Sequence, residues 1–377
     1  MIRFLAISCC LLLPVLPTKA EKPAGGEKSV TLDQLQQILA ADAGKPDLKV
    51  ADQLANLRLR ERAGTARLEA WQSSFKARRT REALLRLADQ SAFLDPPAAD
   101  IPTTPAPPLK DQGAILIRAL AYVRQTLPTL PDFLATRVTT HFQDDPLRDS
   151  PPGLAADQLG LEISGVLPGS AAANPQRLRE TTVSRLRIAY RNGKEVEDSR
   201  RHTQQMAAEG LTTSGEFGPI LVVVLGDALR GTVTWGYWEN GEPGPIAVLR
   251  YRVPRENSHY AVSLPVGETP LQEVPGYHGE VALNPRTGAI LRITVIADLA
   301  APNQDLVADI AVDYGPVAIG DATRICPIRG VALSTVPVRR RSDAALPANV
   351  QTSLNDIAFT DYHLFHADVR ITPAQTP

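Results

Sequence analysis

The stretch NPRTGAILRITVIADL, residues 284–299, decides the fold that we expect for this chain. Pro285 presets the φ angle of a first turn position, and Gly288 can take the left-handed conformation of a bulge. Because side chains alternate along a strand, one face after the turn would carry the apolar residues Leu291, Ile293, Val295, Ala297 and Leu299. The stretch predicts two paired strands, and its apolar face covers either the protein's own core or a ligand.

The first twenty residues, MIRFLAISCCLLLPVLPTKA, have the form of a secretory signal peptide. Arg3 supplies positive charge, and the apolar run 4–16 is shorter than the roughly 20 residues that a spanning helix needs. A lipoprotein signal ending at Cys9 would leave too few residues for an apolar region. We therefore expect cleavage near Ala20 and a soluble protein in the periplasm or secreted, with no transmembrane segment in the mature chain.

Charge and cysteine content bound the function further. Loss of Arg3 and Lys19 with the signal takes the 40 basic residues to 38, against 41 acidic residues, a net charge of −3. This balance gives no electrostatic case for nucleic acid. Cys9 and Cys10 leave with the signal, so Cys326 is the only mature cysteine and no internal disulfide can form.

Two regions are expected, divided by a proline-rich stretch. Residues 21–94 predict a helical domain, an antiparallel bundle in which Thr31 and Gln34 form a capping box and Asp47 caps a second helix. The segment DPPAADIPTTPAPPL, residues 95–109, has six prolines and predicts a semi-rigid linker.

Residues 110–371 predict the second domain, a large curved antiparallel sheet with one or two packed helices, so the fold class is α+β. A helix over 112–127 is apolar nearly all round and should be buried. Hairpin turns are expected at 192–193, 240–241 and 315–316, a long loop at 143–176, a last strand over 357–371, and a disordered tail at 372–377. Trp235 and Tyr237 should share one strand face, with Trp238 opposite.

The hairpin residues Asn284-Pro285-Arg286-Thr287-Gly288 and 289–293 resemble the Asp-Pro-x-Thr-Gly hairpin of periplasmic lipoprotein-carrier proteins of the LolA and LolB type. The resemblance implies an exported half-barrel with helices closing an apolar concavity that holds acyl chains. The chain lacks the proline that often follows Thr-Gly in that family, and its helical N-terminal region has no counterpart there. The whole chain also resembles an uncharacterised family of exported bacterial proteins, which implies no activity.

Several polar residues invite catalytic or metal-binding hypotheses that their context does not favour. His363 and His366 fall on opposite faces of a strand, and zinc needs three or four convergent ligands. Ser258, His259 and Glu280 could form a triad, but the Gly-x-Ser-x-Gly elbow is missing. Cys326 lies among apolar neighbours, which favours an inert buried thiol over a reactive one.

Two charged runs have similar simple explanations. Asp144, Asp145 and Asp149 lack the glycine and terminal glutamate of an EF-hand loop and are expected to be solvated. The basic run KARRTR, residues 76–81, could touch anionic lipid heads or a partner, but a solvated helix end is the favoured interpretation.

The leading hypothesis is an exported, non-enzymatic protein that binds lipid, lipoprotein acyl chains or another hydrophobic ligand in the concavity of its sheet. The candidate ligand-binding face consists of Trp235, Tyr237, Leu291, Ile293 and Val295. The alternative is a cell-envelope structural or protein-interaction module with a fully packed core and an envelope protein as partner. We expect no cofactor and no metal. The ligand, the oligomeric state and the role of Cys326 stay open.

Overall fold

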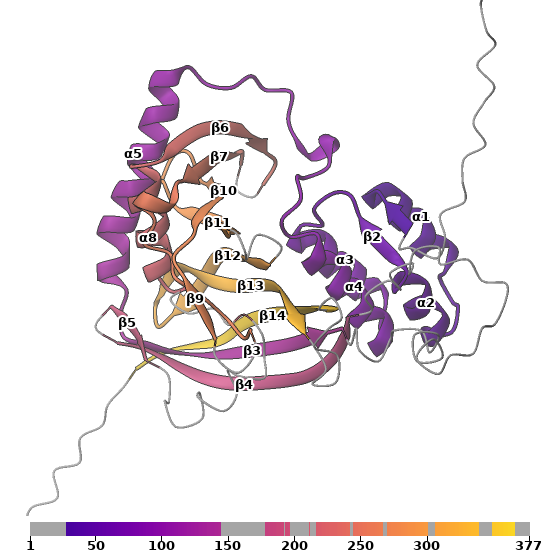
Figure 1. Cartoon of the computed structure of the whole chain (residues 1–377). Coiled ribbons are helices and arrows are strands. Elements are labelled where there is room, and N and C mark those ends of the chain that lie inside the picture. Colours follow the sequence, from indigo (N-terminus) through magenta and orange to yellow (C-terminus); the bar gives the residue numbers. More distant parts are fainter. Residues whose placement is uncertain are drawn as a thin grey trace, which may run out of the picture.

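The structure is a computed structural model, and it describes residues 28–144, 178–191, 193–196, 211, 216–241, 244–266, 270–300, 306–338 and 349–365. The expected signal peptide, most of the 143–176 loop, the C-terminal tail and the residues Asp145, Asp149 and His366 lie outside these ranges. Figure 1 shows helices α1 to α4 on one side of the strands and the long helix α5 on the other.

The N-terminal unit combines four helices with two short strands. Its elements are β1 (Lys28–Val30), α1 (Leu32–Ala41), α2 (Asp47–Leu54), β2 (Leu57–Leu59), α3 (Thr65–Ser74) and α4 (Arg78–Gln90). The expected capping box is confirmed, since the Thr31 hydroxyl accepts from the Gln34 amide and the Gln34 side chain accepts from the Thr31 amide. The expectation of a purely helical bundle is corrected, because β1 and β2 pair in parallel and share the same core.

Asp47 has a different role from the one that its sequence position suggested. The N-cap of α2 is Pro46, and Asp47 is the first residue of that helix. Its carboxylate instead accepts hydrogen bonds from the Arg79 and Thr80 amides, at 3.2 and 2.9 Å, in the first turn of α4. Asp47 therefore caps a neighbouring helix and joins the N-terminal ends of α2 and α4.

The α+β class and the large antiparallel sheet are confirmed. Ten strands lie in the order β5-β4-β3-β14-β13-β12-β11-β10-β7-β6, and all neighbours are antiparallel. They are β3 (Phe133–Gln143), β4 (Arg179–Arg191), β5 (Lys194–Val196), β6 (Thr232–Glu239), β7 (Ile246–Val253), β10 (Gly276–Leu283), β11 (Ile290–Asp298), β12 (Val307–Ile319), β13 (Ala322–Val338) and β14 (Asn349–Leu364). The sheet is open, with β5 and β6 at its ends, and the pairing does not establish the expected half-barrel form.

Two helices cover one face of this sheet, α5 (Leu109–Thr126) and α8 (Pro219–Ala228). The expectation that α5 is buried all round is wrong, because Ile117 is 66% exposed and only Ile115, Ala119 and Val123 are buried. A helix lying on a sheet buries one stripe, so its outer face meets solvent whatever its composition. Within the described residues no helix combines the length and hydrophobicity required to cross a membrane.

The remaining short elements connect these layers. They are η1 (Ala98–Asp100), η2 (Leu127–Thr129), η4 (Arg255–Asn257) and the hairpin β8 (Val262–Leu264) with β9 (Leu271–Glu273). The turn expected at Gly315-Pro316 is also corrected. Both residues lie inside β12, and the chain reverses at Gly320, whose φ of 60° is the left-handed conformation that a tight turn requires.

The 284–289 turn is where helix α5 meets the sheet. The Asn284 side chain accepts from the Arg286 and Thr287 amides, and Gly288 has a φ of 77°. A Cβ on Gly288 would lie 2.2 Å from the Arg118 carbonyl oxygen of α5. The Arg118 guanidinium in turn donates to the Pro285 carbonyl at 2.7 Å. Glycine is thus required for the turn and for the close approach of α5.

Candidate functional site

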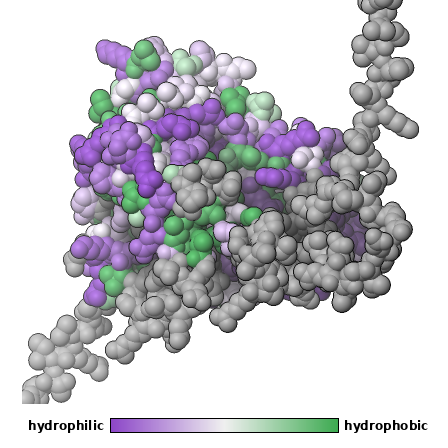
Figure 2. Space-filling model, viewed as in Figure 1, coloured by the Kyte–Doolittle hydropathy of each residue, from purple (hydrophilic) through white to green (hydrophobic). Residues whose placement is uncertain are grey.

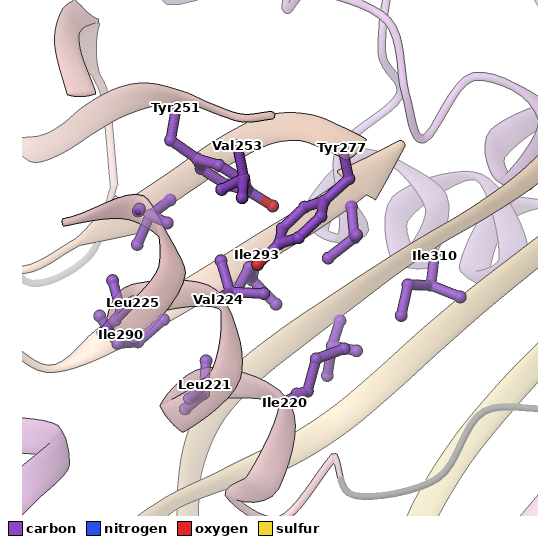
Figure 3. Close-up of a cluster of buried hydrophobic side chains, with 14 of the residues drawn as sticks. Ile220, Leu221, Val224, Leu225, Tyr251, Val253, Tyr277, Ile290, Ile293 and Ile310 are labelled. Carbon is purple, nitrogen blue, oxygen red and sulfur yellow. The ribbon is translucent and has the colours of Figure 1, made fainter. Parts of the chain in front are cut away.

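The long apolar face of β11 covers the protein's own core. Ile293 and Val295 are 0% exposed and belong to the cluster that includes α5 and α8. Figure 3 shows Leu221, Val224 and Leu225 of α8 directed toward Ile290 and Ile293. Helix side chains therefore occupy the position where an acyl chain was expected.

Two bulges change which candidate residues share that face. Opposite β10, Ala282 pairs with Arg292 and Leu283 with Ile290, so Leu291 is the extra residue and lines a cavity on the other face. Opposite β7, Trp235 pairs with Leu249 and Tyr237 with Val248. An inserted residue reverses the alternation of the strand beyond it. The expectation that Leu291 shares a strand face with Ile293, and Trp235 with Tyr237, is therefore wrong.

The aromatic cluster is rearranged accordingly. Trp238, expected on the opposite face, lies with Trp235 against the α5–α8 core, their ring centroids 4.8 Å apart. Tyr237 lies on the other face, where its hydroxyl donates to Glu280 at 2.8 Å. Burial beside Glu280 raises the pKa of Tyr237, although Arg62 opposes the shift. Tyr237 thus belongs to a polar network.

The opposite face of the sheet carries a polar groove. A cavity of about 450 Å³ lies between strands β6, β7, β10 and β11 and the segment 92–95 that follows α4. Antiparallel pairing sets its polar side chains in rows, with Thr232 opposite Arg252 and Thr234 opposite Arg250. Arg252 is in turn opposite His278 on β10. We call this cavity the sheet groove.

The two exposed arginines of the sheet groove, Arg250 and Arg252, have acidic partners but keep donors to spare. Arg250 contacts Asp95 at 2.6 Å and Glu280 at 3.1 Å, and Arg252 contacts Asp298 at 3.1 Å. A guanidinium has five N–H donors, so neither arginine is saturated by these bonds. Their side chains are 50% and 64% exposed, which leaves them accessible to a ligand.

His278 is held in one orientation at the same place. Its Nδ1 lies 2.8 Å from Asp298 Oδ1, and a carboxylate can only accept, so Nδ1 carries the proton. In the neutral ring Nε2 is then an acceptor. The groove therefore combines guanidinium, hydroxyl and imidazole groups with the carboxylates of Asp95 and Glu280, and it can hydrogen-bond a polar molecule.

A deeper cavity of about 160 Å³ shares Ala92 and Arg292 with the sheet groove and lies between the N-terminal unit and the sheet. Buried ion pairs surround it. Arg62 contacts Glu239 at 2.7 Å, and Arg329 contacts Asp89 of α4 as well as Asp356 at 2.9 Å. Burial raises the pKa of Asp89 well above its ordinary value, although Arg329 opposes the shift.

The hypothetical Ser258–His259–Glu280 triad is not assembled. His259 Nδ1 lies 2.6 Å from Asp227 Oδ1, while Glu280 contacts Tyr237 and Arg250 in the sheet groove. The Ser258 hydroxyl accepts from the Tyr260 amide at 3.2 Å. Within the described ranges, no group of three or more His, Cys, Asp or Glu side chains could hold a metal ion.

The other candidates have structural roles in the described part of the chain. Cys326 is buried and free, and burial raises the pKa of its thiol to about 12, so it is not a thiolate near neutral pH. The expectation that Asp144 is solvated is wrong, because the residue is buried and accepts from the Thr352 amide at 2.8 Å, a bond that joins β3 to β14. His363 is exposed on β14.

No protein-family model, curated protein or solved structure matches the chain. The resemblance to lipoprotein carriers thus rests on the short hairpin motif alone. The sheet groove itself was missed at the sequence level, although its alternating Thr and Arg positions are visible. Polar residues that alternate along a strand usually face solvent. The sequence gives no local sign that residues 92–95 would lie over these Thr and Arg positions.

Proposed function

We propose that this is an exported, non-enzymatic interaction module whose sheet groove receives an acidic segment of a cell-envelope partner. The observation that carries the proposal is the accessibility of Arg250 and Arg252, which face the groove beside Thr232 and Thr234. Carboxylates accept two parallel bonds from a guanidinium, and hydroxyls supply further donors.

The shape and the internal ion pairs of the groove fit this class of ligand. The groove is bordered by β6, the end strand of the sheet, and by the segment 92–95, so it suits an extended chain. Asp95 bonds Arg250 although its own side chain is 72% exposed. Exposed pairs of this kind contribute little stability, so an incoming carboxylate can displace Asp95.

Calorimetric titration with a hexaglutamate peptide tests the proposal. We expect binding that weakens with salt, because the Debye length shortens from about 10 Å at 0.1 M to about 3 Å at 1 M. The double variant R250A/R252A should lose at least about tenfold in affinity. The matched control R185A/R187A alters two arginines exposed on β4 and should bind as the native protein does. Equal binding by both variants would place the peptide elsewhere.

Binding of a hydrophobic ligand is the second candidate, and one observation favours it. Helix α8 is apolar outward as well as inward, since Val222 is 56% exposed and Leu229, directly after the helix, is 49% exposed. Figure 2 shows hydrophobic patches among a largely hydrophilic surface. An acyl chain could enter the interior only if α8 moved away from β11. Native mass spectrometry of the purified protein tests this candidate, and protein that never carries lipid would argue against it.

A further inference from the structure

The N-terminal unit gathers basic residues from two separate segments of the chain. Because Asp47 caps α4, the first turn of α2 lies beside residues 76–79. Lys45 and Lys76 line the same cavity, whose volume is about 340 Å³. Lys49 lies in the first turn of α2 and Arg79 in that of α4. We call these four exposed residues the basic rim.

Three acidic groups beside the basic rim are already engaged. Asp42 is buried and bonds Lys45 at 2.5 Å, and Asp47 accepts from the Thr80 hydroxyl as well as from two amides of α4. Glu82 pairs with Arg78 at 2.9 Å. Asp52, one turn further along α2, is exposed. Lys49, Lys76 and Arg79 therefore present positive charge, to which the N-terminal ends of α2 and α4 add.

Apolar side chains accompany these charges. Leu48, directly before Lys49, is 52% exposed, and Phe75, directly before Lys76, is half-buried at the edge of the cavity. A soluble anion offers nothing to an exposed leucine. A lipid bilayer attracts both kinds of group, since basic residues meet its anionic headgroups and apolar side chains enter the acyl boundary.

We propose that the basic rim, together with Leu48 and Phe75, is a membrane-docking surface that binds anionic phospholipid headgroups. Docking there places the cavity between Lys45 and Lys76 over a headgroup phosphate. The site is separate from the sheet groove, whose lining comes from residues 92–95 and the strands. The basic rim therefore supplies attachment to a surface, independently of what the sheet groove binds.

Vesicle co-sedimentation with the purified exported protein tests this docking surface. We expect binding to phosphatidylcholine vesicles that contain about one quarter phosphatidylglycerol, and none to phosphatidylcholine alone. The variant K49A/K76A/R79A keeps the Lys45–Asp42 pair intact and should bind roughly a hundredfold more weakly, at about fivefold for each charge. The matched control K110A/R187A/K194A removes three exposed charges elsewhere and should bind within about twofold of the native protein.

A neutral variant separates lipid from a soluble anion. L48S leaves every charge in place and should weaken vesicle binding several-fold, because the leucine no longer enters the bilayer. Titration with glycerol phosphate is the second arm. Binding of glycerol phosphate without binding of vesicles would overturn the proposal. An equal loss of vesicle binding in the rim variant and in its control would overturn it as well.

Discussion

The guanidinium of Arg329 on β13 contacts the carboxylate of Asp89 on α4, and Asp89 is completely buried. The same guanidinium contacts Asp356 of β14 at 2.9 Å. A second link is nearby, since the Thr65 hydroxyl of α3 donates to Asp313 of β12 at 3.0 Å. Buried polar contacts therefore fix the N-terminal unit on the sheet. Thr65, Asp313 and Arg329 also line the 160 Å³ cavity next to the sheet groove.

Replacement of Arg329 by Met should strongly destabilise the protein. It leaves Asp89 and Asp356 buried without a counter-charge, and breaking such a pair costs about 3–5 kcal/mol in the free energy of unfolding. Urea unfolding measures the change. The double variant D89N/R329M should recover part of the loss, because Asp356 is then the only one of the two carboxylates left without a counter-charge. R185M, an exposed change on β4, should stay within about 0.5 kcal/mol of the native protein.

Gly288→Ala should destabilise the contact between α5 and the 284–289 turn. The new Cβ would be strained at a φ of 77° and would lie 2.2 Å from the Arg118 carbonyl oxygen. We expect a loss of about 2–4 kcal/mol in thermal or urea unfolding. Gly113→Ala, in α5 with open space around it, is the control and should stabilise by up to about 1 kcal/mol. Equal changes in unfolding free energy for the two variants would mean that α5 does not pack against the 284–289 turn.

The strand pattern was predictable from sequence because local chemistry determines it. The turn at 284–289 and the pairing of Arg191 with Lys194 follow from glycines that adopt positive φ. The overall composition of a strand does not reveal a bulge, because one inserted residue barely changes it. Gly236 could have suggested one, since glycine within a strand often marks a bulge.

The candidate site was less accessible to sequence analysis than the fold. Arg250 contacts Asp95, 155 residues away, and that contact exists because the 92–95 segment lies over the strands of the groove. No local sequence pattern determines where residues 92–95 lie on the sheet. The basic rim has the same origin, since Lys49 and Arg79 belong to helices that come together through the capping bonds of Asp47 and a shared core.

Truncation of core residues should distinguish a packed interior from an empty ligand cavity. Ile293→Ala removes a fully buried side chain and should cost about 2–5 kcal/mol in the free energy of unfolding. Val222→Ala, on the exposed side of α8, should cost less than about 1 kcal/mol. Chemical denaturation of both variants provides the measurement. A small cost for Ile293→Ala would indicate that the β11 face borders open space suited to a hydrophobic ligand.

Asp309 of β12 should make stability depend on pH near neutrality. Burial raises its pKa to about 7, Asp298 adds to the shift, and a hydrogen bond with the Ala297 backbone opposes it. In the unfolded chain an aspartate titrates near about 3.9, so the folded state binds the proton more tightly between these two values. The contribution of Asp309 to stability should therefore be greatest below about pH 4, fall as the pH rises to about 7, and then level off.

One substitution, with a second as its control, measures the size of this effect. One pKa unit corresponds to 1.36 kcal/mol, so a shift of about three units gives at most about 4 kcal/mol, and partial solvation reduces it. Asp309→Asn keeps the shape without the charge, so at pH 8 it should be more stable than the native protein, with a flatter dependence of unfolding free energy on pH. Asp321→Asn, in the exposed turn after β12, should keep the native slope. Because neighbouring carboxylates titrate as well, the difference between the two variants reports Asp309 itself, and an unchanged slope in Asp309→Asn would show that its carboxyl remains solvated in the folded protein.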